Sequence, residues 1–179
     1  MVQPSDKKNI SFRFATRADA TALLELATST FYEAFASSNK EEDMLLYTSK
    51  TFSLEQLSAE LQEEQATCIL VYDADVLIGY TRLKTNTSVD TRQYESTLEI
   101  ERFYIRAANT NQHIGSMLMQ ECINYAREKR FGVIILGVWK HNHRAIAFYQ
   151  KWGFSHYGSH PFQLGNDLQT DLLMKKYIS

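Results

Sequence analysis

Two carboxylates inside an apolar segment are the first residues whose types and spacing suggest chemistry. Glu99 and Glu101 lie in residues 97–105, TLEIERFYI, whose pattern predicts a β-strand. Residues two apart share one face of a regular strand, and a carboxylate in a buried strand costs free energy unless it is paired or used. Two interpretations follow. Either the carboxylates take part in chemistry, or they lie on an exposed edge face and pair with Arg82 or Arg102.

Residues 98–119, LEIERFYIRAANTNQHIGSMLM, predict a strand, a loop and the start of a helix. A loop that enters a helix directs several unpaired backbone N–H groups at one point. The helix dipole adds positive potential there, so the unit can hold a diphosphate. Glycine allows the close backbone approach that such a loop needs, and Gly115 is the one glycine in it. From these residues alone, an ordinary strand-to-helix turn explains the segment better than an anion site does.

A third feature is the segment 142–154, NHRAIAFYQKWGF. Asn142 is a residue type that caps helices, Tyr149 lies two turns later on nearly the same face, and Gly153 is suited to end the helix. A cap, a core tyrosine and a terminal glycine explain the three residues separately. They do not explain why this segment follows the other two features in this order.

The remaining patterns predict the elements that position these residues. Alternating and helical apolar spacing gives the order strand, three helices, three strands, helix, strand, helix, two strands. The predicted strands are 11–15, 68–73, 76–84, 97–105, 133–139 and a pair around the turn at 165–166, and the predicted helices are 17–35, 41–49, 53–64, 114–129 and 142–151. The expected fold class is α/β (α+β), with a mixed central sheet of about seven strands flanked by helices. One domain over residues 1–179 is expected, with the polar residues 1–9 frayed.

Composition narrows the classes of protein. The 179 residues are 44% hydrophobic and 22% charged, and the formal charge of −2 argues against a nucleic-acid or anionic-membrane coat. The longest apolar stretch, residues 132–139, is far shorter than the ~20 residues of a membrane span, and the first residues lack the apolar core of a signal peptide. Cys68 and Cys122 are expected to be buried thiols in a reducing cytoplasm. His141 and His143 have no further ligand at metal spacing, so no metal site is expected.

Taken together, residues 98–154 resemble the acetyl-CoA-binding core of the GNAT superfamily of N-acetyltransferases. The segment 142–154 is similar to the family's pattern N-x-x-A-x-x-x-Y-x-x-x-G-F. Further segments resemble the bacterial spermidine/spermine (polyamine) branch, so that the likeness extends over about residues 12–177. These segments are STFYEAF (29–35), TFSLEQLSAEL (51–61), LEIERFYI (98–105), LGVWKHN (136–142) and QTDLLMKK (169–176).

The resemblance implies direct transfer of acetyl from acetyl-CoA to a primary amine, with a polyamine such as spermidine or spermine as the first expectation. Glu101 falls on the family's base position, with Glu99 in reserve, and Tyr149 falls on the general acid that protonates the departing thiolate. The implied cofactor-binding residues are the backbone of Phe103, Tyr104 and Ile105 along the pantetheine arm, the N–H groups of Asn111, Gln112, His113, Ile114, Gly115 and Ser116 around the pyrophosphate, and the side chains of Asn142 and Lys151.

The phosphate loop departs from the family's pattern Q/R-x-x-G-x-G/A. Counted from the end of the strand at Ile105, its six positions are residues 110–115. Thr110 then replaces the leading Gln or Arg, and His113 replaces the first glycine, while Gly115 is retained. The cradle is expected to survive with altered affinity for coenzyme A, and a lost cofactor site is the alternative.

Two other functions stay open beside polyamine acetylation. One is acetylation of a different amine, such as a protein N-terminus, an amino acid or an aminoglycoside. The other is a non-catalytic GNAT-like domain that binds a ligand or partner. The altered loop favours the second, whereas Glu101, Asn142 and Tyr149 oppose it. The expected partner is a small-molecule amine, not nucleic acid or a membrane, and a homodimer is left open.

Overall fold

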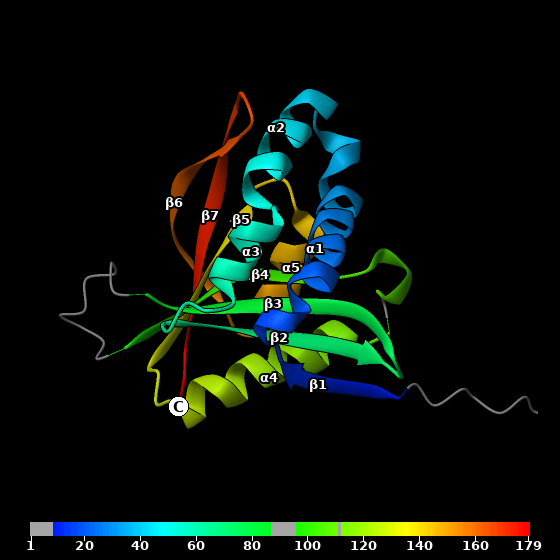
Figure 1. Cartoon of the computed structure of the whole chain (residues 1–179). Helices are drawn as coiled ribbons and strands as arrows, with labels where there is room; N and C mark the ends of the chain where they lie inside the picture. The colour runs from blue at the N-terminus through cyan, green and yellow to red at the C-terminus, as the bar shows by residue number, and fades with distance from the viewer. Residues whose placement is uncertain (1–8, 87–95, 111) are drawn as a thin grey trace, which may run out of the picture.

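The chain was analysed as a computed structural model, which describes residues 9–86, 96–110 and 112–179. Of the segment that the sequence predicts to be frayed, only Asn9 lies within the described residues. Seven strands form one sheet in the order β1-β2-β3-β4-β5-β7-β6 (Figure 1). The strands are β1 Ile10–Phe14, β2 Ala66–Asp73, β3 Val76–Asn86, β4 Thr97–Ile105, β5 Val133–Trp139, β6 Ser155–Leu164 and β7 Asp167–Tyr177. The predicted mixed sheet of about seven strands is confirmed.

Five α-helices flank the sheet in the predicted order. They are α1 Ala20–Phe35, α2 Glu41–Thr51, α3 Leu54–Glu60, α4 Ile114–Glu128 and α5 His143–Lys151. Side-chain caps mark the start of α3 and α5. The Ser53 hydroxyl accepts a hydrogen bond from the Gln56 N–H, and the Asn142 amide oxygen accepts one from the Ala145 N–H. Both predicted hairpins form. Ala74 turns the chain between β2 and β3 at φ 51°, and Gly165 turns it between β6 and β7 at φ 57°.

Two apolar clusters hold the helices on opposite faces of the sheet (Figure 1). Helices α1, α2 and α3 cover one face, with Leu26, Met44 and Leu57 fully buried. Helix α4 covers the other face, with buried residues Ile114, Leu118, Met119, Cys122, Ile123 and Ala126. A fully buried aliphatic side chain contributes about 1.5–3 kcal/mol, so this packing fixes the first turn of α4 on the sheet. Cys68 and Cys122 are both buried and free, each in a different cluster.

None of the helices in the described part of the chain combines the length and the apolar composition that a membrane-spanning helix needs.

Strands β4 and β5 are the one parallel pair among the described strands, and they diverge partway along their length. Their pairing runs from Thr97 opposite Val133 to Ile100 opposite Leu136 and then ends. Beyond that point β4 pairs only with β3, and β5 pairs only with β7. The second half of β4 therefore presents one unpaired backbone edge to the space between the strands.

Candidate functional site

Two adjoining cavities open where β4 and β5 part. The helix-end cavity, of about 510 Å³, lies between the ends of β4 and the first turns of α4 and α5, with part of α1 as its opposite wall. The strand cavity, of about 450 Å³, lies over β4, β5, β6 and β7 beneath α1 and α2. The residues that line both are Phe35, Phe103, Tyr104, Asn142, Ala145 and Tyr149. A molecule in one cavity can therefore meet a molecule in the other.

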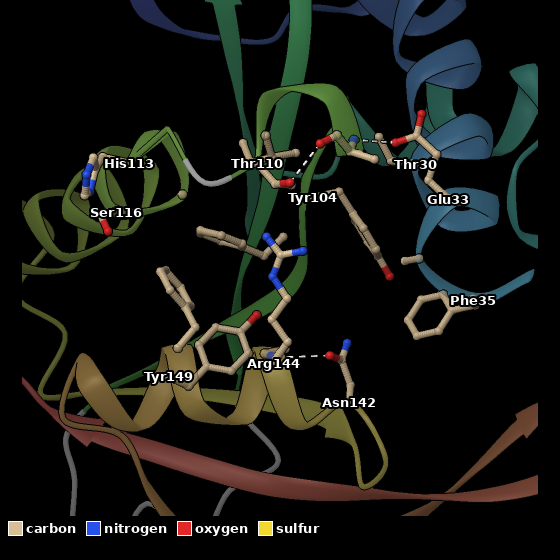
Figure 2. Close-up of a pocket in the computed structure, with 17 residues that line it drawn as sticks. Thr30, Glu33, Phe35, Tyr104, Thr110, His113, Ser116, Asn142, Arg144 and Tyr149 are labelled. Carbon is tan, nitrogen blue, oxygen red and sulfur yellow. Dashed lines mark hydrogen bonds between the residues drawn. The ribbon is translucent and has the colours of Figure 1, made fainter. Parts of the chain in front are cut away.

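The helix-end cavity is suited to an anion. Helices of 15 and 9 residues, α4 and α5, both begin at it, and the first N–H groups of a helix have no partner within the helix. The Arg144 side chain extends from α5 into the middle of this cavity, on the side that faces Thr110 (Figure 2). Two helix ends and a guanidinium at one cavity are features that favour the binding of phosphate groups.

His113 occupies the position where the sequence pattern expects a glycine. It precedes α4 with φ 60° and ψ 2°, in the left-handed region that glycine adopts at the lowest cost. This supports the alignment of residues 110–115 with the family's loop, because the backbone there has the conformation that explains a glycine. The imidazole is exposed at the outer side of the helix end, and His113, Gly115 and Ser116 all line the cavity (Figure 2).

Hydrogen bonds to α1 and within the turn fix the chain between β4 and α4. The Glu33 carboxylate accepts from the Ala107 N–H at 2.7 Å, and the Thr110 hydroxyl donates to the Ala107 carbonyl at 2.8 Å (Figure 2). The Arg106 guanidinium also donates to the Ser29 hydroxyl at 3.3 Å. The side chain of Thr110, which replaces the family's Gln or Arg, thus stabilises the turn that contains it.

Tyr149 stands at the junction of the two cavities. Its ring is 8% exposed and packs against Phe148, Phe154 and Phe103, at centroid distances of 5.5, 5.8 and 6.3 Å. Burial raises the pKa of Tyr149 above the ordinary range of tyrosine, so the hydroxyl keeps its proton at neutral pH. Figure 2 shows this hydroxyl directed into the cavity. A protonated donor at this place is suited to stabilise or protonate a leaving anion.

Glu101 lies in the strand cavity at an irregular position of β4. Arg82 pairs with Arg102 and Leu83 pairs with Ile100, so Glu101 is the extra residue of a β-bulge. Its carboxylate, with 35% of the side chain exposed, accepts a hydrogen bond from the Arg82 guanidinium. The sequence left open whether these carboxylates pair with an arginine, and the ion pair between Glu101 and Arg82 is present. Glu101 nevertheless lines the cavity. Glu99 lines it as well, two residues earlier on β4.

Three cations balance the carboxylates next to Glu101. Arg82, 4% exposed, also bonds to Glu63, and Lys84 pairs with Glu63 at 2.6 Å. Arg102 donates to both oxygens of Glu60, at 2.6 and 3.0 Å. This charge network connects β3, β4, α3 and the segment after α3, and it holds Glu101 in a fixed orientation.

Aromatic rings form most of the wall of the strand cavity. They include Phe35 and Trp139 with centroids 6.3 Å apart, and Tyr47 and Phe162 with centroids 5.4 Å apart. Asp171 of β7 lines the same cavity, and its Oδ1 is buried without a hydrogen-bond partner among the described residues. Burial raises the pKa of the Asp171 carboxyl, and His160 opposes that effect.

The structure gathers most of the residues predicted for the site but not all of them. Those that line a cavity are Glu101, Phe103, Tyr104, Ile105, His113, Gly115, Ser116, Asn142 and Tyr149. The Gln112 side chain turns back to the Ala108 carbonyl, and the Ile114 side chain is buried under α4, so these two residues can offer only their backbone. Lys151 is exposed at the end of α5 and is not among the lining residues. Asn111 lies outside the described residues.

Sequence reasoning missed Arg144, Phe35 and Asp171. Arg144 lies inside the motif 142–154, and its charge next to a helix start was an available signal. Phe35 and Asp171 gave no comparable signal, because their place in the site depends on how α1 and β7 pack against distant strands.

Comparisons with known proteins find a matching family model and a relative in sequence. The model of the acetyltransferase (GNAT) family matches residues 21–154. The chain is 30% identical over 160 residues to an uncharacterised N-acetyltransferase in the pepI 3′ region of Lactobacillus delbrueckii subsp. lactis, covering 89% of this chain and 92% of that one.

Two solved structures share the fold. The PaiA N-acetyltransferase of Thermoplasma acidophilum in complex with coenzyme A has a TM-score of 0.79 and 22% identity, covering 94% of this chain and 99% of that one. YncA of Salmonella typhimurium, solved with its cofactor acetyl-CoA, has a TM-score of 0.69 and 22% identity, covering 96% and 95%.

Proposed function

The chain belongs to the acetyltransferase (GNAT) family and is an N-acetyltransferase with acetyl-CoA as its cosubstrate, and on this premise we propose that the acetyl acceptor is a polyamine such as spermidine or spermine. The observation that carries the proposal is the junction of the two cavities. The helix starts and Arg144 of the helix-end cavity suit an anionic coenzyme. The aromatic walls of the strand cavity, with three carboxylates beside Arg102, suit an organic cation.

The residues of the helix-end cavity fit coenzyme A. The first turns of α4 and α5 and the Arg144 guanidinium would hold the pyrophosphate. The open edge of β4 at Phe103, Tyr104 and Ile105 offers backbone groups with which the amides of the pantetheine arm can pair like an added strand. Asn142 already uses its amide oxygen as the helix cap, so its amide nitrogen is the group left for the ligand.

The acceptor must lose a proton before it reacts. An alkylamine has a pKa of about 10.4, as lysine does, and it is almost entirely protonated at pH 7. We assign the removal of this proton to Glu101, directly or through one water, with Glu99 as the reserve. Arg82 orients the Glu101 carboxylate toward the strand cavity side of β4.

Transfer then proceeds without an acyl-enzyme. The amine lone pair forms a bond to the thioester carbonyl carbon, and the nitrogen, which then carries a positive charge, gives its extra proton to water. The carbon–sulfur bond breaks, and the thiolate leaves with the electron pair. We assign to Tyr149 the donation of a proton to that thiolate, since its hydroxyl is protonated and lies at the junction of the cavities.

An amine panel tests the acceptor. Coenzyme A release is followed by thiol detection with spermidine, spermine, lysine, a peptide with a free N-terminus and kanamycin at equal concentrations. We expect the highest kcat/KM for spermidine or spermine, because the strand cavity places carboxylates next to aromatic faces. If the peptide or kanamycin is the best acceptor, the polyamine assignment is wrong and the acetyltransferase activity stands.

A further inference from the structure

One carboxylate of the strand cavity lacks the cation partner that balances Glu101. Within the described residues no lysine or arginine forms an ion pair with Asp171, and its Oδ1 has no hydrogen-bond partner. A partly buried carboxylate without a partner is costly to keep in a fold. The mechanism assigned to Glu101 and Tyr149 makes no use of it. Asp171 therefore needs an explanation of its own.

Sheet register places Asp171 in a row of side chains. It pairs with Trp139 of β5 on one side and with His160 of β6 on the other, so the three side chains share one face of the sheet. Gly137 lies two residues before Trp139 on that face. The row faces α1 and α2, since Phe162 and Leu164 follow His160 at intervals of two on the same face of β6 and pack into the cluster of these helices.

Gly137 has no side chain in the middle of this row, so the strand cavity reaches the backbone of β5 there. A methyl group added there would lie 3.5 Å from Asp171 Oδ2 and 3.3 Å from His160 Nε2. The Nδ1 of His160 lies 2.9 Å from the Pro161 carbonyl, which can only accept, so Nδ1 carries the hydrogen when the ring is neutral, and Nε2 is then an acceptor. The space over Gly137 is thus bounded by the Asp171 carboxylate, the Nε2 atom of His160 and the indole of Trp139.

We propose that this space, bounded by Asp171, His160 and Trp139, is a subsite for a second ammonium group of the acceptor. An ammonium has several N–H donors and a positive charge, which match two acceptors and the face of a nearby ring. The subsite lies in the strand cavity and the reacting amine meets the acetyl group at the cavity junction, so the enzyme selects amines with a second cation. This inference rests on the proposed function.

A matched pair of amines isolates the subsite. 1,4-Diaminobutane and 1-aminobutane have the same carbon chain, and only the first has a second ammonium group. The wild-type enzyme is expected to favour the diamine in kcat/KM by about 10-fold or more, the size of one hydrogen-bonded charge pair. Asp171→Asn should reduce this preference to within about threefold, chiefly through a higher KM for the diamine.

Two further variants complete the design. Asp75→Asn makes the same chemical change at an exposed turn and should keep the wild-type preference. Gly137→Ala keeps every charge but fills part of the space, so it should also lower the preference for the diamine. This variant replaces Asp171→Asn as the test if Asp171→Asn does not fold. Equal losses for both amines in Asp171→Asn, or no preference in the wild type, would overturn the subsite.

Binding separates this inference from the proposed function. Spermidine should raise the unfolding temperature of the wild-type protein and raise it less in Asp171→Asn, whether or not acetyl transfer occurs. A spermidine shift that is absent in the wild type, or equal in both proteins, contradicts the subsite. Absence of turnover together with a shift that depends on Asp171 contradicts the proposed acceptor chemistry and supports the subsite.

Discussion

Replacing Tyr149 by phenylalanine tests the assigned acid with little structural change. The ring is 8% exposed and makes its contacts with Phe103, Phe148 and Phe154 through carbon atoms, so Tyr149→Phe keeps them and removes one hydroxyl. The melting temperature and the affinity for acetyl-CoA should change little. The loss should appear in kcat, because the interaction is made in the transition state.

The size of the loss follows from the chemistry of the leaving group. General acid–base groups contribute typically 10²–10⁴ in rate, which is roughly 2.7–5.4 kcal/mol of barrier. A thiol has a pKa of about 8.5, so thiolate is already a fair leaving group, and a loss of about 10² is expected. Pre-steady-state and steady-state rates with saturating acetyl-CoA and spermidine measure it.

A kcat of Tyr149→Phe within about threefold of wild type would remove the hydroxyl from the mechanism and leave Tyr149 as a core aromatic. Glu101→Gln would then show whether any side chain assists proton transfer. A large fall in melting temperature would instead mean that the hydroxyl has a structural role.

Three predictions concern the coenzyme side: acetyl-CoA binding, the role of Arg144 and the backbone strain at His113. Free acetyl-CoA at about 100 times its Kd should add roughly 2.7 kcal/mol to the free energy of unfolding, seen as a higher melting temperature, and no shift at millimolar acetyl-CoA would contradict the cradle. Arg144→Gln should need about 10 times more acetyl-CoA for the same shift. His113→Gly should raise the melting temperature, because a side chain in the left-handed region costs about 1–2 kcal/mol and the added freedom of the unfolded chain offsets only part of that gain. His143→Gly, in the first turn of α5, should lower it, and equal shifts of one sign in both variants would contradict the strain at His113.

The elements that the sequence predicted well are those that depend on the spacing of neighbouring residues. The strand 97–105 and the helix beginning at Ile114 were predicted at their observed bounds, because apolar alternation and helical spacing are properties of neighbouring residues. The resemblance of residues 142–154 to the family's pattern pointed to Asn142 and Tyr149, and both line the helix-end cavity.

Features that depend on pairing between distant strands were not predictable. The bulge at Glu101 exists only in the register of β4 against β3, whereas its pairing with Arg82 was one of two pairings that the sequence left open. Asp171 meets His160 and Trp139 only because β7 pairs with β6 on one side and with β5 on the other. The left-handed conformation of His113 was hidden for a different reason, since its side chain gives no sign of it.

The parting of β4 and β5 also has a consequence for the motions of the protein. Four residue pairs, Thr97–Ile100 against Val133–Leu136, join the block of β1 to β4 to the block of β5 to β7. Such a short seam allows the blocks to open as separate cooperative units, at a lower free energy than global unfolding. A coenzyme held by β4 and α4 on one side and by α5 on the other would link the two blocks and oppose their separation. Exchange of the amide hydrogens next to the gap then becomes a record of cosubstrate occupancy, independent of turnover.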